Sequence, residues 1–415
     1  MRVTTDYAWS IYYVNFPYFV VSPFAFSNSV KTSITLGLIK RARAIAQAKL
    51  TVSVIVPFNR PVGYNYCIVN VQTNIPLSSL TTMKIGGNAN YVANVTSKHE
   101  LQQVYQNSKK LNQPVYVIGG GSNLIAHDDG FPGLIIHNQI MGITISDDNP
   151  TATTIIAGAG EIWDNLVKYT VDLELSGMEA MSGIPGTAGA APVQNIGAYG
   201  QEIANTFVSC EAYDTTSDSF VTLTWDDCQF SYRHSIFRGE AAGRYIITSI
   251  TVSLNKTVPE PPFYDALDKY LTSKHIDPTA VTVQIIRDAV LDIRMNKLPD
   301  PKILPNTGSF FKNAIVEKWK ADDLLKTYSD MPTYPVDDQH TKIPAGWLIE
   351  SCNLKGEVIH GMKVHDGNAV VLVNDAATGY ADLAAARDDI ITAVRDKFQI
   401  VLEQEPLELN PTDKA

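Results

Sequence analysis

Ser309 stands in a stretch whose side chains could do chemistry. The segment NTGSFFKN, residues 306–313, places this serine between a glycine and two phenylalanines, with Lys312 and Asn313 close behind. A Thr-Gly-Ser tripeptide is by itself typical of a turn. The segment alone therefore leaves two interpretations open, a catalytic hydroxyl and a hydroxyl that merely sits at a turn.

Three consecutive glycines follow an apolar run in the segment VIGGGSNL, residues 117–124. Glycine permits positive φ and a close backbone approach, so successive amides can surround an anionic group. The spacing differs from the G-x-G-x-x-G of dinucleotide-binding folds. A tight structural turn and a ligand-binding loop are equal alternatives here.

A second loop of small residues lies at SGIPGTAGAAPVQNIGAYGQEI, residues 182–203. Small side chains along a path make a groove in which backbone amides face a ligand. A flexible linker would be richer in serine and other polar residues. The alternation of small and apolar residues therefore favours a ligand-lining loop.

A basic and aromatic group stands at YRHSIFR, residues 232–238. The Arg233 guanidinium is a fixed-charge fork suited to a carboxylate or a phosphate. A solvated arginine in a strand or turn is the alternative. His234 has no partner at a metal-ligand spacing, so no metal site is predicted.

The periodicity of the chain indicates a mixed α+β fold. Ser97 and Glu100 form the S-x-x-E pattern that begins a helix. A larger domain extends to about residue 255, and a smaller one begins near residue 277 after the proline-rich stretch VPEPPFYDAL. Helices are expected over residues 101–111, 161–175, 283–296 and 382–398, and strands over residues 114–118, 133–138, 151–160, 243–254, 369–374 and 399–409.

The composition is that of an ordinary globular protein. The chain has 415 residues, 45% hydrophobic and 18% charged, with a net charge of −10. Asp6 is the only acidic residue before Glu100, so the remainder is strongly acidic. This argues against a nucleic-acid partner. The scattered cysteines indicate a reduced, intracellular protein.

Residues 1–68 differ in character from the rest. Residues 7–30 carry no charge, but Pro17 and Pro23 weaken the case for a membrane anchor. No clear signal-peptide cleavage site is present. An artefactual or poorly ordered extension, an interaction or anchor segment, and a structural element all stay open, and no stable membrane association is expected.

Taken together, the motifs from about residue 75 to residue 408 resemble the UDP-N-acetylmuramate dehydrogenase family, also called UDP-N-acetylenolpyruvoylglucosamine reductase. Eight segments match in the family's order over more than three hundred residues. They are GGGSNL, GIPGTAGAAPVQNIGAYG, YRHSIFR, KLPDP, GSFFKN, AGWLIE, VHDGNAVVLVN and VLEQE.

The resemblance implies a flavoenzyme of peptidoglycan precursor synthesis. Its fold would be a two-part FAD-binding domain of the vanillyl-alcohol-oxidase/PCMH type over residues 69–255. A hinge and tyrosine loop (256–276) and a smaller α+β substrate-binding domain (277–415) would follow. FAD and NADPH are the implied cofactors, and a UDP-sugar is the substrate. A cytoplasmic monomer is expected.

The resemblance also assigns catalytic roles. Ser309 looks like the proton donor to C2 of the enolpyruvyl group, which accepts a hydride at C3. Arg233 looks like the carboxylate-binding cation, and Glu405 looks like its acidic partner, which would need a raised pKa. Glu403 lies two residues from Glu405 and would share its strand face, so it is the alternative.

Further contacts are implied by the same motifs. The cofactor-binding residues would be Gly119, Gly120, Gly121, Ser122, Asn123, Gly183, Ile184, Pro185, Gly186, Gln194, Asn195 and Gly197. The substrate-binding residues would be Tyr199, Tyr232, Tyr264, Lys297, Asn313 and Asn368. The segment around Tyr264 resembles the subclass that keeps a tyrosine-bearing loop over the substrate.

Two departures from the family pattern leave rival functions open. Ala314 follows SFFKN where a proline is usual, which would relax the turn that aims Ser309. Gln404 stands in LEQEP where the usual order is L-E-P-E. An FAD-dependent oxidase with a related flavin domain and an inactive UDP-sugar-binding homologue are the alternatives.

Overall fold

The computed structural model describes residues 51–54 and 69–410, and it divides the chain into two compact units, residues 1–73 and 74–415. In the first unit, β1 (Thr51–Val54) pairs antiparallel with β2 (Val69–Pro76), whose end lies in the second unit. Our interpretations of residues 1–50 and 55–68 lie outside the described residues.

The second unit opens with three parallel strands. After the turn η1 (Leu77–Ser79), β6 (Phe131–Asn138) lies between β3 (Asn88–Val95) and β4 (Val115–Ile118). Helix α2 (Lys98–Lys110) connects β3 to β4, and its predicted start is confirmed because the Ser97 hydroxyl accepts from the Glu100 amide. Buried Val92 and Ile135 belong to the core of this layer.

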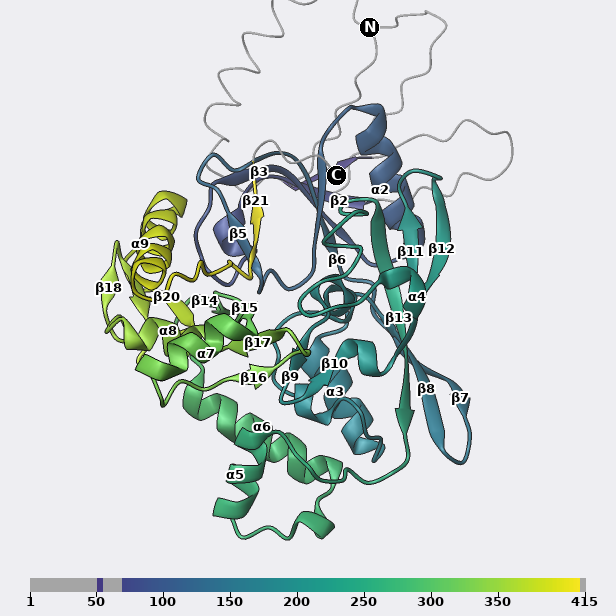
Figure 1. Cartoon of the computed structure of the whole chain (residues 1–415). Helices are drawn as coiled ribbons and strands as arrows, with labels where there is room; N and C mark the ends of the chain where they lie inside the picture. Colours follow the sequence, from purple (N-terminus) through teal and green to yellow (C-terminus); the bar gives the residue numbers. More distant parts are fainter. Residues whose placement is uncertain (1–50, 55–68, 411–415) are drawn as a thin grey trace, which may run out of the picture. The chain divides into compact units, whose positions relative to one another are not determined.

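A second sheet is antiparallel throughout, with the order β12-β11-β13-β8-β7 (Figure 1). Helix α3 (Trp163–Asp172), predicted from its apolar spacing, buries Trp163, Leu166 and Val167 in the core of this sheet. The strands are β7 (Ile143–Asp148), β8 (Ala152–Gly158), β11 (Phe207–Asp214), β12 (Ser219–Thr224) and β13 (Tyr245–Asn255).

The loop of small residues is folded into short elements between these strands. They are η2 (Glu179–Met181), η3 (Ala188–Gln194), β9 (Gly197–Ala198), β10 (Gln201–Glu202) and η4 (Ile203–Asn205), with α4 (Trp225–Cys228) further on. Buried Ala188 and Ala191 place η3 in the core with α3. The loop is thus close-packed, as predicted, and not a linker.

The proline-rich stretch leads into two helices, α5 (Asp265–Ser273) and α6 (Val283–Lys297), with the turn η5 (Pro278–Ala280) between them. Ile286 and Val290 of α6 share a core cluster with Ala180 and with α5. Helix α6 therefore packs against the small-residue loop. The predicted domain boundaries stay a prediction.

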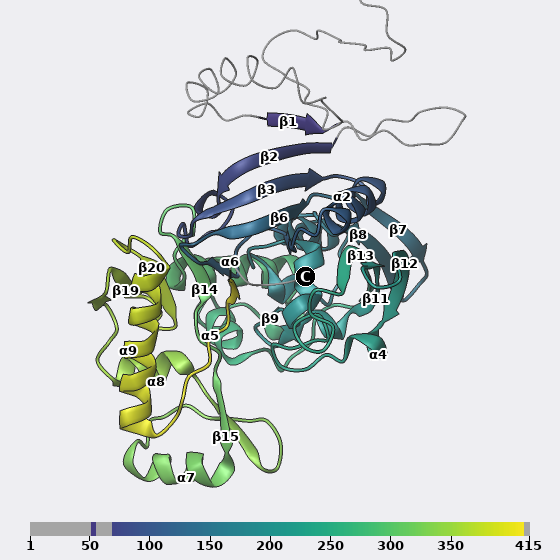
Figure 2. The ribbon, with the colours of Figure 1, turned by 90° about the horizontal axis from the view of Figure 1, so that it is seen from above.

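The C-terminal elements gather around one large core that includes Phe310, Phe311 and Leu348. Helices α8 and α9 lie beside β19 and β20 (Figure 2). The helices are α7 (Lys318–Thr327), α8 (Ala345–Ser351) and α9 (Tyr380–Phe398). One sheet has the order β14 (Asn306–Ser309), β20 (Val371–Asn374), β19 (Met362–Val364), β18 (Val358–Ile359), and the other β15 (Ala314–Glu317), β17 (His340–Ile343), β16 (Tyr334–Pro335).

The predicted final strand over residues 399–409 is wrong for most of its length. Gln399 ends α9 in the left-handed conformation, with φ of 56°. Before Pro406, which has no N–H to donate, the segment makes one isolated bridge, from Gln404 to Phe311. Only β21 (Leu407–Leu409) is a strand, and it runs parallel to β5 (Leu124–Ala126), far earlier in the chain (Figure 1).

These arrangements confirm the α+β prediction. Three segments belong to different layers but all lie in the second unit. They are the three consecutive glycines at residues 119–121 (the glycine turn), the loop of small residues 182–203 (the small-residue loop) and β14. No helix among residues 51–54 and 69–410 is both long enough and apolar enough to cross a membrane.

Candidate active site

Segments from far apart in the sequence line one cleft. The glycine turn forms one wall, the small-residue loop a second, and β14 a third. Arg233 and Glu405 line the same cleft. The lining residues include residues 116–124, 184–187 and 196–198, together with Trp163, Gln194, Arg233, Arg294, Leu298, Thr307, Gly308, Ser309, Glu405 and Leu407.

The glycine turn approaches the small-residue loop very closely. A Cβ at position 119 would lie 2.3 Å from the Thr187 Oγ1, and one at position 120 would lie 3.2 Å from the Gly186 Cα. Gly121 has φ of +62°, and its Cβ would meet the Leu80 carbonyl oxygen at 1.9 Å. Both interpretations of the glycines are therefore compatible, because the turn that the packing requires also faces the cleft.

Ser309 ends β14, and its exposed side chain faces the cleft. Gly308 has φ of +72°, while a Cβ there would meet nothing within 4 Å. Glycine is thus required for its backbone conformation and not for space. The Asn306 Oδ1 accepts from the Gly308 amide at 2.8 Å and holds this turn. The turn interpretation of Ser309 holds, and the turn presents the hydroxyl to the cleft.

Glu405 is brought to Ser309 by the backbone. Its amide donates to the carbonyl of Phe310, the residue after Ser309, at 2.9 Å. The Arg233 Nε lies 3.1 Å from the Glu405 Oε1, but off the line that a hydrogen bond needs, so this contact is an ion pair. Arg233 also donates from NH2 to the Gly197 carbonyl at 3.0 Å. The three predicted catalytic residues therefore share one site.

Burial opposes ionisation of the Glu405 carboxyl, while the neighbouring cations favour it. The residue is 8% exposed. Burial raises the pKa of the Glu405 carboxyl, and the nearby charges of Arg233 and Arg238 oppose this only in part. The Gln194 Nε2 donates to its Oε1 at 3.3 Å.

Glu403 has a different environment. It is exposed and pairs with Lys312 at 3.1 Å. The prediction that Glu403 and Glu405 share a strand face is wrong, because residues 401–406 do not form a strand.

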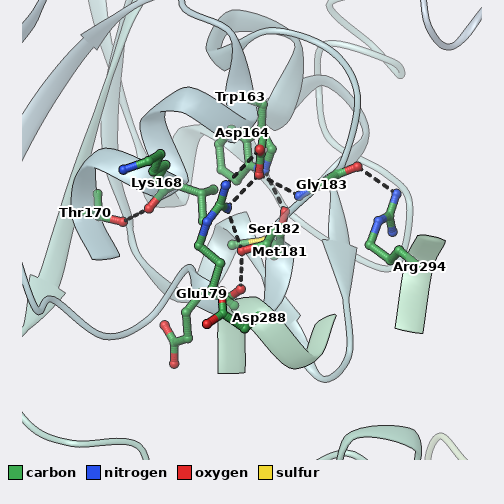
Figure 3. Close-up of polar contacts among 12 residues, drawn as sticks. Trp163, Asp164, Lys168, Thr170, Glu179, Met181, Ser182, Gly183, Asp288 and Arg294 are labelled. Carbon is green, nitrogen blue, oxygen red and sulfur yellow. Dashed lines mark hydrogen bonds and ion pairs between the residues drawn. The ribbon is translucent and has the colours of Figure 1, made fainter. Parts of the chain in front are cut away.

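A buried network holds the start of the small-residue loop (Figure 3). The two oxygens of Asp164 accept from Arg287 at 2.7 and 2.9 Å, and Oδ1 also accepts from the Gly183 amide at 2.6 Å. Arg287 donates to the Ser182 hydroxyl at 2.9 Å, and Arg294 donates to the Gly183 carbonyl at 2.9 Å. Helix α6 thus anchors the loop just before it enters the cleft.

The charge of Asp164 is stabilised by this network. Burial by itself would raise the pKa of Asp164, but the Arg287 fork and the Gly183 amide outweigh it and hold the pKa below its usual range. Arg287 is 7% exposed. Its loss would leave a partly buried carboxylate without its cation.

A second cavity adjoins the cleft and shares its wall at Gly119, Thr187 and Ala190. Its lining includes Tyr116, Phe237, Tyr245, Ile247 and Arg238, together with polar residues that include Glu408. The Arg238 NH1 donates to the Gln194 Oε1 at 2.7 Å. The sequence analysis missed this cavity.

The hydrogen-bonding capacity of the cleft fits a bound cofactor. Among the described residues, four buried side-chain polar atoms have no hydrogen-bond partner, and they belong to Thr81, Thr82, Arg233 and Thr307. Thr307 lines the cleft, as does Arg233, whose Nε contacts the Glu405 carboxyl instead, and Thr81 and Thr82 adjoin Gly121. Since buried polar groups normally have partners, this clustering fits an elongated polar molecule such as FAD.

The predicted cofactor residues fall into two groups. Ten of them line the cleft, namely Gly119, Gly120, Gly121, Ser122, Asn123, Ile184, Pro185, Gly186, Gln194 and Gly197. Gly183 and Asn195 do not. Asn195 is 1% exposed and bonds to Glu202, Ser231 and Ala204. Asn195 therefore holds the loop together, and Gly183 is held by Asp164.

The predicted substrate residues lie outside the lining of the cleft. The rings of Tyr199 and Tyr264 meet edge to face, 5.9 Å apart, and line a separate hollow. Tyr232 lies beside Asn313, whose Oδ1 accepts from the Ala345 amide.

The last two predicted substrate residues lie on segments whose backbones approach each other. Lys297 is exposed at the end of α6. A Cβ placed on Gly367, the residue before Asn368, would lie 3.3 Å from the Lys297 carbonyl oxygen. The structure thus groups these six residues in pairs.

Arg294 and Arg238 were missed although signals for both were present. Arg294 stands three residues before Lys297, and Arg238 ends the YRHSIFR motif. Either could have been found by treating every arginine near a motif as a candidate anion ligand. The partner of Arg287 could not have been found from the sequence, because Asp164 lies 123 residues away.

Family comparisons match two parts of the chain. A model of the FAD binding domain matches residues 89–221, and one of the UDP-N-acetylenolpyruvoylglucosamine reductase C-terminal domain matches residues 300–408. The UDP-N-acetylenolpyruvoylglucosamine reductase of Neisseria gonorrhoeae is 42% identical over 75% of this chain and 90% of its own. The reductases of the same name from Amoebophilus asiaticus and Escherichia coli O157:H7 are 38% and 37% identical, covering 81% and 80% of this chain and 98% and 95% of theirs.

A solved structure has the same fold. The crystal structure of UDP-N-acetylenolpyruvylglucosamine reductase from Thermus caldophilus aligns with a TM-score of 0.56 and 20% identity, over 83% of this chain and 100% of its own. At this identity the likeness supports the fold alone.

We expect Arg287→Met to lower the free energy of unfolding by about 3 kcal/mol, because the partly buried Asp164 carboxylate then lacks its cation. The double variant Asp164→Leu/Arg287→Met should recover part of this loss. Urea unfolding measures both. The matched control is Arg395→Met, whose exposed ion pair with Asp396 should be worth about 1 kcal/mol at most. Equal losses in Arg287→Met and the control would contradict the anchoring role.

Proposed function

The chain belongs to the UDP-N-acetylenolpyruvoylglucosamine reductase family, and we propose that Ser309, Arg233 and Glu405 perform the protein's part of its reaction. The enzyme reduces UDP-N-acetyl-3-O-(1-carboxyvinyl)-glucosamine to UDP-N-acetylmuramate with NADPH, in peptidoglycan precursor synthesis. The observation that carries the residue assignment is that these side chains, distant in sequence, line one cleft.

The glycine turn and the small-residue loop are the proposed FAD site. When bound there, FAD would supply the hydride-transfer chemistry between NADPH and C3 of the enolpyruvyl group. The backbone amides of residues 119–123 would hold the diphosphate, since successive amides bind anions. The adjoining aromatic cavity with Arg238 would take the rest of the nucleotide.

Arg233 and Glu405 would bind the substrate carboxylate. As the C3–H bond forms, the electron pair of the double bond moves toward C2 and the carboxylate, so negative charge grows there. A fixed cation and a preorganised donor stabilise this charge more strongly in a buried site than in water. Glu405 can donate only when protonated, and the burial that raises its pKa favours that form.

Ser309 would supply the proton that forms the C2–H bond. A serine hydroxyl is a weak acid, but an enolate carbon is a strong base, so the transfer is downhill once charge has moved to C2. The left-handed Gly308 and its Asn306 contact aim the hydroxyl. Ala314, whose departure from the family pattern put this aim in question, starts β15 opposite Ile343.

The remaining predictions complete the proposal. Tyr199, Tyr232, Tyr264, Lys297, Asn313 and Asn368 would bind the UDP-sugar. We place the enzyme in the cytoplasm as a monomer, with NADPH and the UDP-sugar as its partners. Analytical ultracentrifugation of the flavin-loaded chain tests the oligomeric state.

A direct test of the function uses the purified chain. It should show a flavin absorption spectrum and oxidise NADPH rapidly only when the enolpyruvyl sugar nucleotide is present. A colourless protein that does not take up FAD would refute the proposal, and a flavoprotein inert toward this substrate would favour the inactive homologue.

We expect Ser309→Ala to slow reoxidation of the reduced flavin by substrate about 10²- to 10⁴-fold, the range that a positioned proton donor contributes. Reduction by NADPH should stay nearly unchanged, because that step needs no proton from Ser309. Stopped-flow absorbance separates the two half-reactions. Ser309→Cys keeps a donor and should recover part of the rate. An equal decline in both half-reactions would make Ser309 structural.

The pH dependence tests Glu405. The donor form is protonated, so the reoxidation rate should be highest below the raised pKa of Glu405 and fall as the pH increases through it. Glu405→Gln keeps a donor that does not titrate, so this alkaline decline should disappear. Rate–pH profiles measure the effect. Glu403→Gln is the control, since its exposed ion pair contributes little. Survival of the decline in Glu405→Gln would rule out the assignment.

A further inference from the structure

Thr307 is a buried residue whose hydroxyl makes no hydrogen bond within the described part of the protein. It is 6% exposed, and its Oγ1 has no hydrogen-bond partner. A buried hydroxyl that loses water without gaining a partner costs about 1–3 kcal/mol. A valine of the same shape would avoid that cost, so the hydroxyl calls for an explanation.

The position of Thr307 supplies one. It lines the cleft two residues before Ser309, in the irregular part of β14. The register of β14 against β20 is regular at Asn306 and at Ser309 and shifts between them. Such irregularities often redirect a side chain beside an active site. The irregularity leaves both Thr307 and Ser309 in the lining of one cleft.

Two other buried threonines, outside the cleft, have hydrogen-bond partners. The fully buried Thr170 donates to the Val167 carbonyl at 2.8 Å, and Thr153 donates to the Asp148 Oδ1 at 2.7 Å. Thr307 has no such neighbour within hydrogen-bonding distance. Strand propensity alone would therefore not explain why the Thr307 hydroxyl, unlike these two, faces the cleft without a partner.

We propose that the Thr307 hydroxyl is a specificity contact that donates a hydrogen bond to an acceptor oxygen or nitrogen of a ligand in the cleft. The inference rests on the proposed function, which puts FAD and the sugar nucleotide there. Both molecules offer such acceptors, and Thr307 lines the cleft together with Ser309 and Leu298. Its role is to position the ligand, and no bond forms or breaks at Thr307.

The test is Thr307→Val, which removes the hydroxyl and keeps the shape. Losing one neutral hydrogen bond should weaken binding about 3- to 10-fold. If the acceptor belongs to FAD, flavin fluorescence after dilution of the holoenzyme will show faster FAD release. If it belongs to the substrate, flavin absorbance will show weaker binding of the enolpyruvyl sugar nucleotide to the oxidised holoenzyme. Either result supports the inference. Thr307→Ser keeps the hydroxyl and should restore binding.

Thr170→Val is the matched control. It removes a satisfied hydroxyl, so it should lower the melting temperature while leaving both ligands bound as in the wild type. If Thr307→Val changes neither FAD release nor substrate binding by more than about twofold, the inference is wrong. It is equally wrong if Thr307→Ser fails to restore binding, since the effect then lies in packing. The wild-type protein reports on the proposed function separately, through its flavin content and turnover.

Discussion

The burial of one carboxyl beside one guanidinium is the constraint that organises this site. Glu405 comes from the last segment of the chain and Arg233 from the loop after α4, and the partly buried guanidinium lies 3.1 Å from the buried carboxyl. The Glu405 amide also bonds to the carbonyl that follows Ser309. One residue thus connects the C-terminal segment to the cation on one side and to the proposed proton donor on the other.

The surrounding frame makes this arrangement rigid. Helix α6 holds the small-residue loop through Arg287 and Arg294, and the glycine turn fits against the same loop with no room for a Cβ at position 119. Among the described residues, nearly all buried polar side-chain atoms of the frame have hydrogen-bond partners, whereas some of those at the cleft do not. That contrast is the physical sign of a site completed by its ligands.

Much of the fold could be predicted because it rests on local signals. The apolar spacing predicted α3 and α9, and Ser97 marked the start of α2. The final strand was mispredicted because the alternation of residues 399–409 combines a helix end, a backbone bridge and the three-residue β21. Alternation does not reveal which strand, if any, a segment pairs with. Here the pairing partner is β5, nearly three hundred residues earlier.

The sequence by itself determined the residue types, their motifs and the family resemblance, and these predicted Ser309, Arg233 and Glu405, with Glu403 as the alternative to Glu405. Only the tertiary structure distinguished Glu405 from Glu403, because burial depends on the neighbours contributed by Arg233, Gln194 and Phe310. Only the tertiary structure exposed the unpartnered hydroxyl of Thr307 and the link between Asp164 and Arg287. Long-range contacts and desolvation arise from the whole fold, and no local pattern of residues encodes them.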